Sequence, residues 1–120
     1  MSTSHLLLFA TIAILCVRCS LAPVIGGPVN HERLVDGSYE GSYERGPNKA
    51  VVKVTVEDSK IVTIQLLEHS AWRGKKAELV IPRIIIERQS TEVDAVSGAT
   101  NSSRVIMNAV QRAIERAYQE

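Results

Sequence analysis

Residues 94–103, with the sequence DAVSGATNSS, combine a tight turn with the start of the last helix, and the rest of the chain is organised around them. Gly98 provides a position where a positive φ or a close backbone approach meets no Cβ. Residues 100–103 carry hydroxyl and amide side chains, the types that cap helix N-termini. The following residues predict an amphipathic helix because their apolar side chains recur at helical spacing: Ile106, Val110, Ala113 and Ala117.

The start of this helix suits a phosphate group. A helix N-terminus offers unpaired backbone N–H groups and the positive end of the helix dipole. The hydroxyl of Thr100 follows only the small residues Gly98 and Ala99, which leave it accessible to a phosphoryl group. The residues alone predict a place where a phosphate fits, and they also fit a plain helix cap or turn hydroxyl.

Residues 94–100 resemble the flavinylation motif of the FMN-binding domain family, D-x-x-[ST]-G-A-[TS]. The likeness extends along the chain. Residues 35–41 are similar to the family's opening DGxYxG, residues 52–68 to its β-hairpin, and residues 89–93 to the lead-in to the motif. Together these stretches lie within residues 35–118, almost all of the chain outside its N-terminus.

The resemblance implies a covalent cofactor. In covalent members of the family, the last Thr or Ser of the motif carries FMN through a phosphoester, installed from FAD by a Mg-dependent flavin transferase. By position, the acceptor here is Thr100. Asp94 then serves recognition by the transferase or helps Mg to organise the transfer; its alternative role is an Asx-turn acceptor. The expected cofactor-binding residues are Thr100, Asp94, Ser97, Gly98, Ala99, Ser102 and Ser103.

Two strands are predicted from alternating apolar and polar residues, with turns at residues 46–48 and 58–59. The apolar positions of the first strand are Val52, Val54 and Val56. Those of the second are Val62, Ile64 and Leu66. Residues 38–44 predict an edge strand with a bulge at Gly41.

Residues 71–89 leave two interpretations open. Their apolar residues fit a helical stripe, but Pro82 breaks or kinks a helix, which indicates a short helix before it and another opened by it. Residues 84–86, Ile-Ile-Ile, also fit a buried strand. The expected fold class is α+β: a small antiparallel sheet with helices packed on one face, and a C-terminal amphipathic helix after the flavin-attachment turn.

The N-terminus predicts export. Residues 6–17 form an uninterrupted run of apolar and small residues, typical of a signal peptide and shorter than the roughly 20 residues of a membrane-spanning helix. We expect residues 1–22 to be a signal peptide or a membrane or lipid anchor, with Cys16 or Cys19 as the lipidated residue in the last case. Residues 23–33 are expected to be a linker, because prolines and glycines cluster over 21–30. The domain then spans residues 34–120.

Composition excludes some functions. Lys and Arg number 14 against 13 Asp and Glu, a net charge of +1, and aromatic residues make up 4% of the chain. Neither a basic surface nor a stacking platform for nucleic acid is therefore expected. No Ser/His/Asp arrangement, carboxylate pair or metal-ligand spacing stands out, so no catalytic or metal-binding residue is predicted.

Three further side-chain groups have open roles. His69 is expected in a surface turn, with hydrogen bonding to a flavin as the alternative. Trp72 packs on the isoalloxazine or covers the end of the sheet. Arg73, Lys75 and Lys76 are expected on a solvated helix face, with screening of a phosphate as the alternative.

We therefore expect an exported electron-transfer module of the cell envelope, membrane-anchored or extracytoplasmic, with covalent FMN on Thr100 and redox proteins or a membrane electron-transfer complex as partners. Whether it is an enzyme stays open. The alternatives are a non-covalent FMN-binding sensor or storage module and a flavin-free interaction domain.

Overall fold

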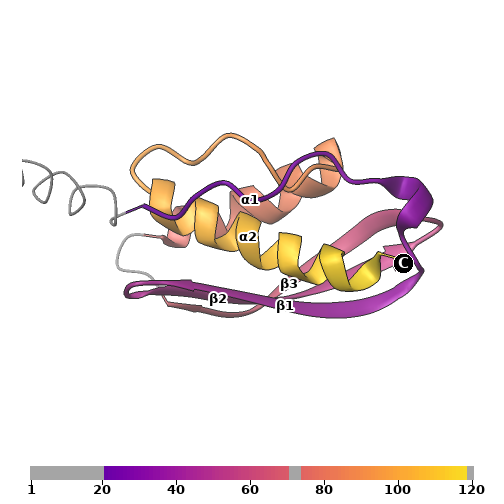
Figure 1. The fold of residues 1–120 in the computed structure, drawn as a ribbon. Coiled ribbons are helices and arrows are strands. Elements are labelled where there is room, and N and C mark those ends of the chain that lie inside the picture. Colours follow the sequence, from indigo (N-terminus) through magenta and orange to yellow (C-terminus); the bar gives the residue numbers. More distant parts are fainter. Residues whose placement is uncertain (1–20, 71–73, 119–120) are drawn as a thin grey trace, which may run out of the picture.

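The computed structural model describes residues 21–70 and 74–118 (Figure 1). The N-terminal run with Cys16 and Cys19, and also Trp72 and Arg73, lie outside the described residues. In order, the elements are η1 (His31–Arg33), β1 (Gly37–Arg45), β2 (Asn48–Glu57), β3 (Lys60–Ser70), α1 (Lys75–Arg88) and α2 (Thr100–Ala117). Among the described residues, no helix combines the length and the apolar character needed to cross a membrane.

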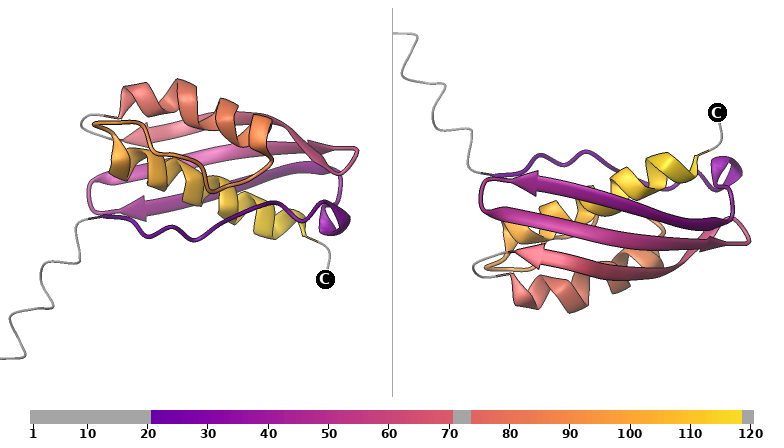
Figure 2. Two further views of the ribbon diagram at one scale, coloured as in Figure 1. Left: turned by 90° about the horizontal axis from the view of Figure 1, so that it is seen from above. Right: turned by 90° about the horizontal axis from the view of Figure 1, so that it is seen from below.

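The strands form one antiparallel sheet in the order β1-β2-β3, and both helices pack on the same face of it (Figures 1 and 2). The helix α2 lies across β1 and β2, whereas α1 lies over β3 and beside α2. The view from below in Figure 2 shows the other face of the sheet uncovered by helices. The predicted α+β fold is thus confirmed.

Tight turns join the strands where the sequence predicts them. Gly46 and Pro47 connect β1 to β2. Asp58 and Ser59 connect β2 to β3 with φ of 51° and 61°, the positive pair that a type I′ hairpin turn requires. Asp36 holds this turn, because its carboxylate accepts the backbone N–H groups of Asp58 and Ser59 at 3.0 Å each.

The alternation predicted for β2 is confirmed, and that for β3 is wrong at its first apolar position. Val52, Val54 and Val56 are fully buried. In β3, Ile61 is buried and Val62 is exposed. The reason is an irregularity in the pairing of β2 with β3: Thr55 faces Thr63 and Val56 faces Ile61, so Val62 is an extra residue and the alternation changes phase.

The expected bulge at Gly41 is absent, since the pairing of β1 with β2 runs without a break from Gly37 to Arg45. Gly41 has a different purpose. A Cβ at this position would overlap the backbone of α2 at Ala109 and Ala113. The absence of a side chain therefore lets the helix lie directly on the edge strand.

Pro82 lies inside a continuous helix, which corrects the prediction of two short helices and also excludes a strand at residues 84–86. Pro82 has no N–H for the carbonyl of Glu78, and this loss normally breaks a helix. Here one face of α1 is buried against the sheet and α2, and such packing supplies most of a helix's stability. The buried residues of that face include the proline itself: Ala77, Ile81, Pro82 and Ile85.

The predicted apolar stripe of α2 is confirmed, because its four residues are all at most 1% exposed: Ile106, Val110, Ala113 and Ala117. Together with the inward side chains of β2 and α1, they form one hydrophobic core. The helix α2 is thus held along its length, and its first turn is fixed relative to the sheet.

The segment expected to be a linker packs along α2. We call residues 22–34 the N-terminal strap. At its start, the Ala22 amide donates to Asn101 Oδ1 at 2.8 Å, and farther on the Val29 amide donates to Gln89 O at 3.0 Å. The strap contains no strand and only the short η1 turn, as its prolines and glycines predict, but it buries three apolar side chains: Ala22, Val29 and Leu34.

Candidate functional site

The turn before α2 has the geometry that the sequence predicts. The Ala99 amide donates to Val96 O at 2.9 Å, and Gly98 has φ of +81°. A four-residue turn with this bond and a positive φ only at its third residue is of type II, which favours glycine there. Ser97 and Gly98 are exposed at its tip, whereas Ala99 is buried.

The helix starts at Thr100 with Ala99 as its N-cap residue, and no side chain caps it. This corrects the expectation that residues 100–103 provide a cap. The first intrahelical bond runs from the Ser103 amide to Ala99 O at 2.8 Å. Within the described part of the chain, no hydrogen bond leaves the amides of Thr100, Asn101 or Ser102. The first turn also contains no acidic residue, so these amides and the helix dipole together favour an anion.

Ser103 joins the turn to the helix from inside. Its side chain is fully buried. The hydroxyl donates to Ala99 O at 2.7 Å and accepts the Val96 amide at 3.0 Å. An Asx turn at Asp94 would use that same Val96 amide. That amide is already bonded to Ser103. The described structure therefore does not show the alternative role of Asp94 as an Asx-turn acceptor.

Thr100 differs from the three polar residues that follow it. Asn101 binds the Ala22 amide, Ser102 contacts His69, and Ser103 closes the turn. Among the described residues, no hydrogen-bond partner is found for the Thr100 side chain, which is partly exposed. Of the four polar side chains at residues 100–103, that of Thr100 is thus the one left open in the described structure.

Asp94 is exposed on the segment that leads to the turn. It lines a hollow of about 240 Å³ with Arg88 and Glu92, over the end of α1. The described contacts include none between its carboxylate and Thr100. Asp94 is thus placed where a protein bound from outside can reach it.

His69 is not in a surface turn, contrary to the prediction. It lies in β3 with its side chain only 3% exposed. Its Nδ1 is 2.7 Å from Glu78 Oε1, and its Nε2 is 3.1 Å from Ser102 Oγ. The pairing of β2 with β3 shifts at Val51 and Val52, which makes Leu67 an extra residue and turns His69 toward the helices. In the sequence, the adjacent apolar residues Leu66 and Leu67 interrupt the alternation at this shift, without indicating which residue is the extra one.

Glu78, His69 and Ser102 are hydrogen-bonded in that order, as in a hydrolase triad, which the spacing of these residues along the chain did not indicate. Ser102 is only 4% exposed, and its hydroxyl faces the histidine inside the protein. A nucleophile must reach a reacting atom. The group therefore links elements of the fold, and a substrate has no access to the serine.

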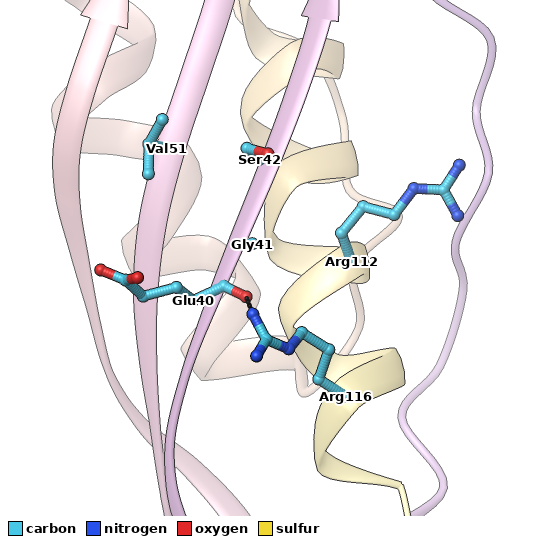
Figure 3. Close-up of a pocket in the computed structure, with 6 residues that line it drawn as sticks. All are labelled: Glu40, Gly41, Ser42, Val51, Arg112 and Arg116. Atoms are coloured by element: carbon cyan, nitrogen blue, oxygen red, sulfur yellow. Dashed lines mark hydrogen bonds between the residues drawn. The ribbon is translucent and has the colours of Figure 1, made fainter.

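A larger hollow, about 290 Å³, lies elsewhere, between α2 and the edge strand β1 (Figure 3). Arg116 donates to Glu40 O at 3.1 Å, and Arg112 pairs with Glu115 at 3.0 Å. Figure 3 shows the two guanidinium groups pointing in opposite directions. Arg112 is also about 18 Å along α2 from Thr100 at 1.5 Å per residue. This hollow is separate from the predicted site.

Residues 46–115 match the family model of the FMN-binding domain. The chain belongs to the FMN-binding domain family. The match covers most of the sheet, α1, the turn at residues 96–99 and the first 16 residues of the 18-residue α2. As a member of this family, the chain is a flavin-binding module with FMN as its cofactor.

The chain is also similar to an uncharacterized protein of Treponema pallidum (strain Nichols). The two are 31% identical over 87 residues, which cover 68% of this chain and 23% of that protein. The chain thus spans less than a quarter of the length of this relative.

The residues of this FMN-binding domain fit the phosphate end of FMN. The open amides of α2 are donors for phosphate oxygens, and no carboxylate of the first turn opposes them. Lys75 and Lys76 are exposed at the start of α1, as predicted for a solvated helix face. Ser102 and Ser103 were expected to bind the cofactor, but their hydroxyls are engaged inside the protein.

Proposed function

We propose that this FMN-binding domain carries FMN covalently on Thr100 through a phosphoester and works as an electron carrier outside the cytoplasm. The observation that carries the proposal is that, within residues 21–70 and 74–118, the Thr100 hydroxyl and the neighbouring amides of α2 have no hydrogen-bond partner. Its three polar neighbours are engaged within the protein. Thr100 is therefore the hydroxyl of the first turn of α2 that an external phosphoryl donor can use, whereas the exposed Ser97 lies in the turn before the helix.

In the attachment reaction, FAD donates its FMN half to Thr100. The Thr100 oxygen forms a bond to the phosphorus of the FMN half, the pyrophosphate bond breaks, and AMP leaves. The hydroxyl proton is released, and no electrons are exchanged. A flavin transferase with Mg supplies the catalysis, as the resemblance to covalent members of the family implies.

The protein's own part is attachment and orientation. The amides at the start of α2 bind the phosphate, and Gly98 keeps the tip of the turn free of a side chain. Asp94, exposed before the turn, is the contact for the transferase. Bound FMN supplies the redox chemistry, in steps of one or two electrons.

The N-terminal sequence supports a location outside the cytoplasm. Residues 6–17 have the length and apolar character of a signal peptide. A domain outside the cytoplasm has no cytoplasmic pool from which to replace a lost FMN, so a covalent bond retains the cofactor. Redox partner proteins, or a membrane electron-transfer complex, then exchange electrons with the domain.

The test is a denaturing gel of the full chain co-expressed with a flavin transferase in an exporting host, viewed under ultraviolet light. A fluorescent wild-type band and a dark Thr100→Val band support the proposal, and Thr100→Ser is expected to keep fluorescence. A dark wild-type band from a protein that is yellow when native indicates non-covalent binding. A colourless protein, with transferase active on a control substrate, indicates a flavin-free interaction domain.

A further inference from the structure

His69 connects three elements of the domain at the end where the flavin is proposed to attach. The ring belongs to β3, Glu78 to α1 and Ser102 to the first turn of α2. The imidazole is 3% exposed, whereas the Glu78 side chain is 34% exposed. The buried side chain of His69 thus links the start of α2 to both the sheet and α1.

The hydrogen bonds define how the ring is used. The Glu78 carboxylate accepts, so Nδ1 of His69 carries a proton. In the neutral ring, Nε2 then accepts the hydroxyl hydrogen of Ser102; in the protonated ring, Nε2 donates to the same oxygen. Ser102 is held in either state. Glu78 fixes the ring, and the ring fixes Ser102.

Ser102 belongs to the end of α2 that is proposed to bind the phosphate, because its own amide is one of the three with no hydrogen bond among the described residues. Other contacts fix the rest of that end: Asn101 is bonded to Ala22, and Ser103 to the turn at Val96. Asn101, Ser102 and Ser103 are thus each attached to a different part of the domain. The first turn of α2 is held rigidly while the Thr100 hydroxyl stays open.

We propose that His69 is a positioning residue for phosphoester formation at Thr100. It acts through Ser102, and it keeps the amides of α2 aimed at the phosphate that Thr100 attacks. The inference rests on the proposed function. Because displacement of a reacting group by about 1 Å can slow a reaction about a hundredfold, a loosened first turn is expected to slow flavin loading.

The experiment measures the rate of transferase-dependent flavin loading of the full chain, by in-gel fluorescence over time, with FAD and transferase in excess. Three variants separate the contacts. His69→Gln can place an amide near Nε2 and keep the Ser102 contact. His69→Asn can place one near Nδ1 and keep the Glu78 contact. His69→Leu keeps neither. We expect the rate of flavin loading to be about tenfold below wild type in His69→Leu and equally low in His69→Asn. In His69→Gln the rate should be close to that of the wild type.

A control separates positioning from general loss of stability. Ile61 is buried at the opposite end of β3 from His69, so Ile61→Val destabilises the same strand away from the first turn of α2 and is expected to load at the wild-type rate. Circular dichroism at the assay temperature identifies variants that are folded. Should His69→Leu not fold, Ser102→Ala, which removes only the hydroxyl, is expected to show the same tenfold loss.

The outcomes distinguish this inference from the proposed function. Loading of folded His69→Leu, or of Ser102→Ala, at the wild-type rate overturns the role of His69. So does equal slowing by Leu, Asn and Gln, which would show a packing role without a specific contact to Ser102. Covalent loading of Thr100→Val, in contrast, overturns the proposed attachment site itself.

Discussion

The Val96 amide donates to the side-chain oxygen of Ser103 at 3.0 Å, and this bond ties the attachment turn to the first turn of α2. The same hydroxyl donates to Ala99 O at 2.7 Å. A side chain of the helix thus satisfies the turn that precedes it. Ser103 therefore has a structural purpose that does not require the cofactor.

Replacing Ser103 with Ala is expected to lower the free energy of unfolding by about 1–3 kcal/mol, because the Val96 amide loses its acceptor in a partly buried place. Urea denaturation followed by circular dichroism measures this change. Ser97→Ala, at the exposed tip of the turn, is the matched control and should change stability by less than about 0.5 kcal/mol. Equal stability of the two variants would contradict the role given to Ser103.

Gly41→Ala is expected to be among the most damaging single changes in the sheet. The added Cβ overlaps backbone atoms of α2 at Ala109 and Ala113, and backbone cannot move aside as a flexible side chain can. A loss of about 3 kcal/mol or more in stability is expected. Gly27→Ala serves as control, since its Cβ meets nothing within 4 Å. A wild-type melting temperature for Gly41→Ala would contradict the close approach of α2.

Gly98→Val is expected to block flavin loading while the β2–β3 hairpin stays folded. Gly98 has φ of +81°, which a β-branched residue adopts only with strain, although a Cβ there meets no atom of the described chain within 4 Å. The side chain would instead occupy the space from which the transferase approaches. Asn adopts a positive φ more readily than Val, so Gly98→Asn separates the effect of backbone strain from the effect of an added side chain. Normal loading of folded Gly98→Val, measured by in-gel fluorescence, would argue against this picture.

Thr91→Val tests the N-terminal strap. Thr91 is 1% exposed, and its Oγ1 accepts the Gly27 amide at 3.0 Å. The single hydroxyl hydrogen is shared between Gln111 Oε1 at 2.6 Å and Gly27 O at 3.2 Å. The variant keeps the shape of the side chain but removes these bonds, at an expected loss of about 1–3 kcal/mol.

Hydrogen exchange provides a local measure of the same change. The Gly27 amide should exchange faster in Thr91→Val, because its acceptor is gone. Thr63→Val, at an exposed position of β3, should leave that amide unchanged. Unchanged exchange at Gly27 in Thr91→Val would show that the strap does not depend on this contact.

The sequence predicts those parts of the fold that depend on local chemistry. Val52, Val54 and Val56 alternate with polar residues and are buried, and the stripe of α2 has helical spacing. Turn residues lie where the chain reverses. The attachment turn follows from Gly98, whose positive φ was anticipated from the residue type.

Features that depend on distant parts of the chain were not predicted. The phase of β3 changes at Val62 and again at Leu67. Adjacent apolar pairs, Ile61–Val62 and Leu66–Leu67, interrupt the alternation there, but they do not indicate which residue of each pair faces the core. His69 faces inward only because of the second shift. Pro82 stays within α1 because packing outweighs local preference, and the strap is held largely through its backbone.

The most direct test of covalent flavin on Thr100 is the mass of one tryptic peptide. Cleavage after Arg88 and Arg104 releases residues 89–104, which contain Thr100 and every other hydroxyl of the attachment stretch. With transferase present, the peptide should gain the mass of FMN less one water, and fragmentation should place it on Thr100. An unmodified peptide from a fully loaded yellow protein, or the added mass on another residue, would contradict the account.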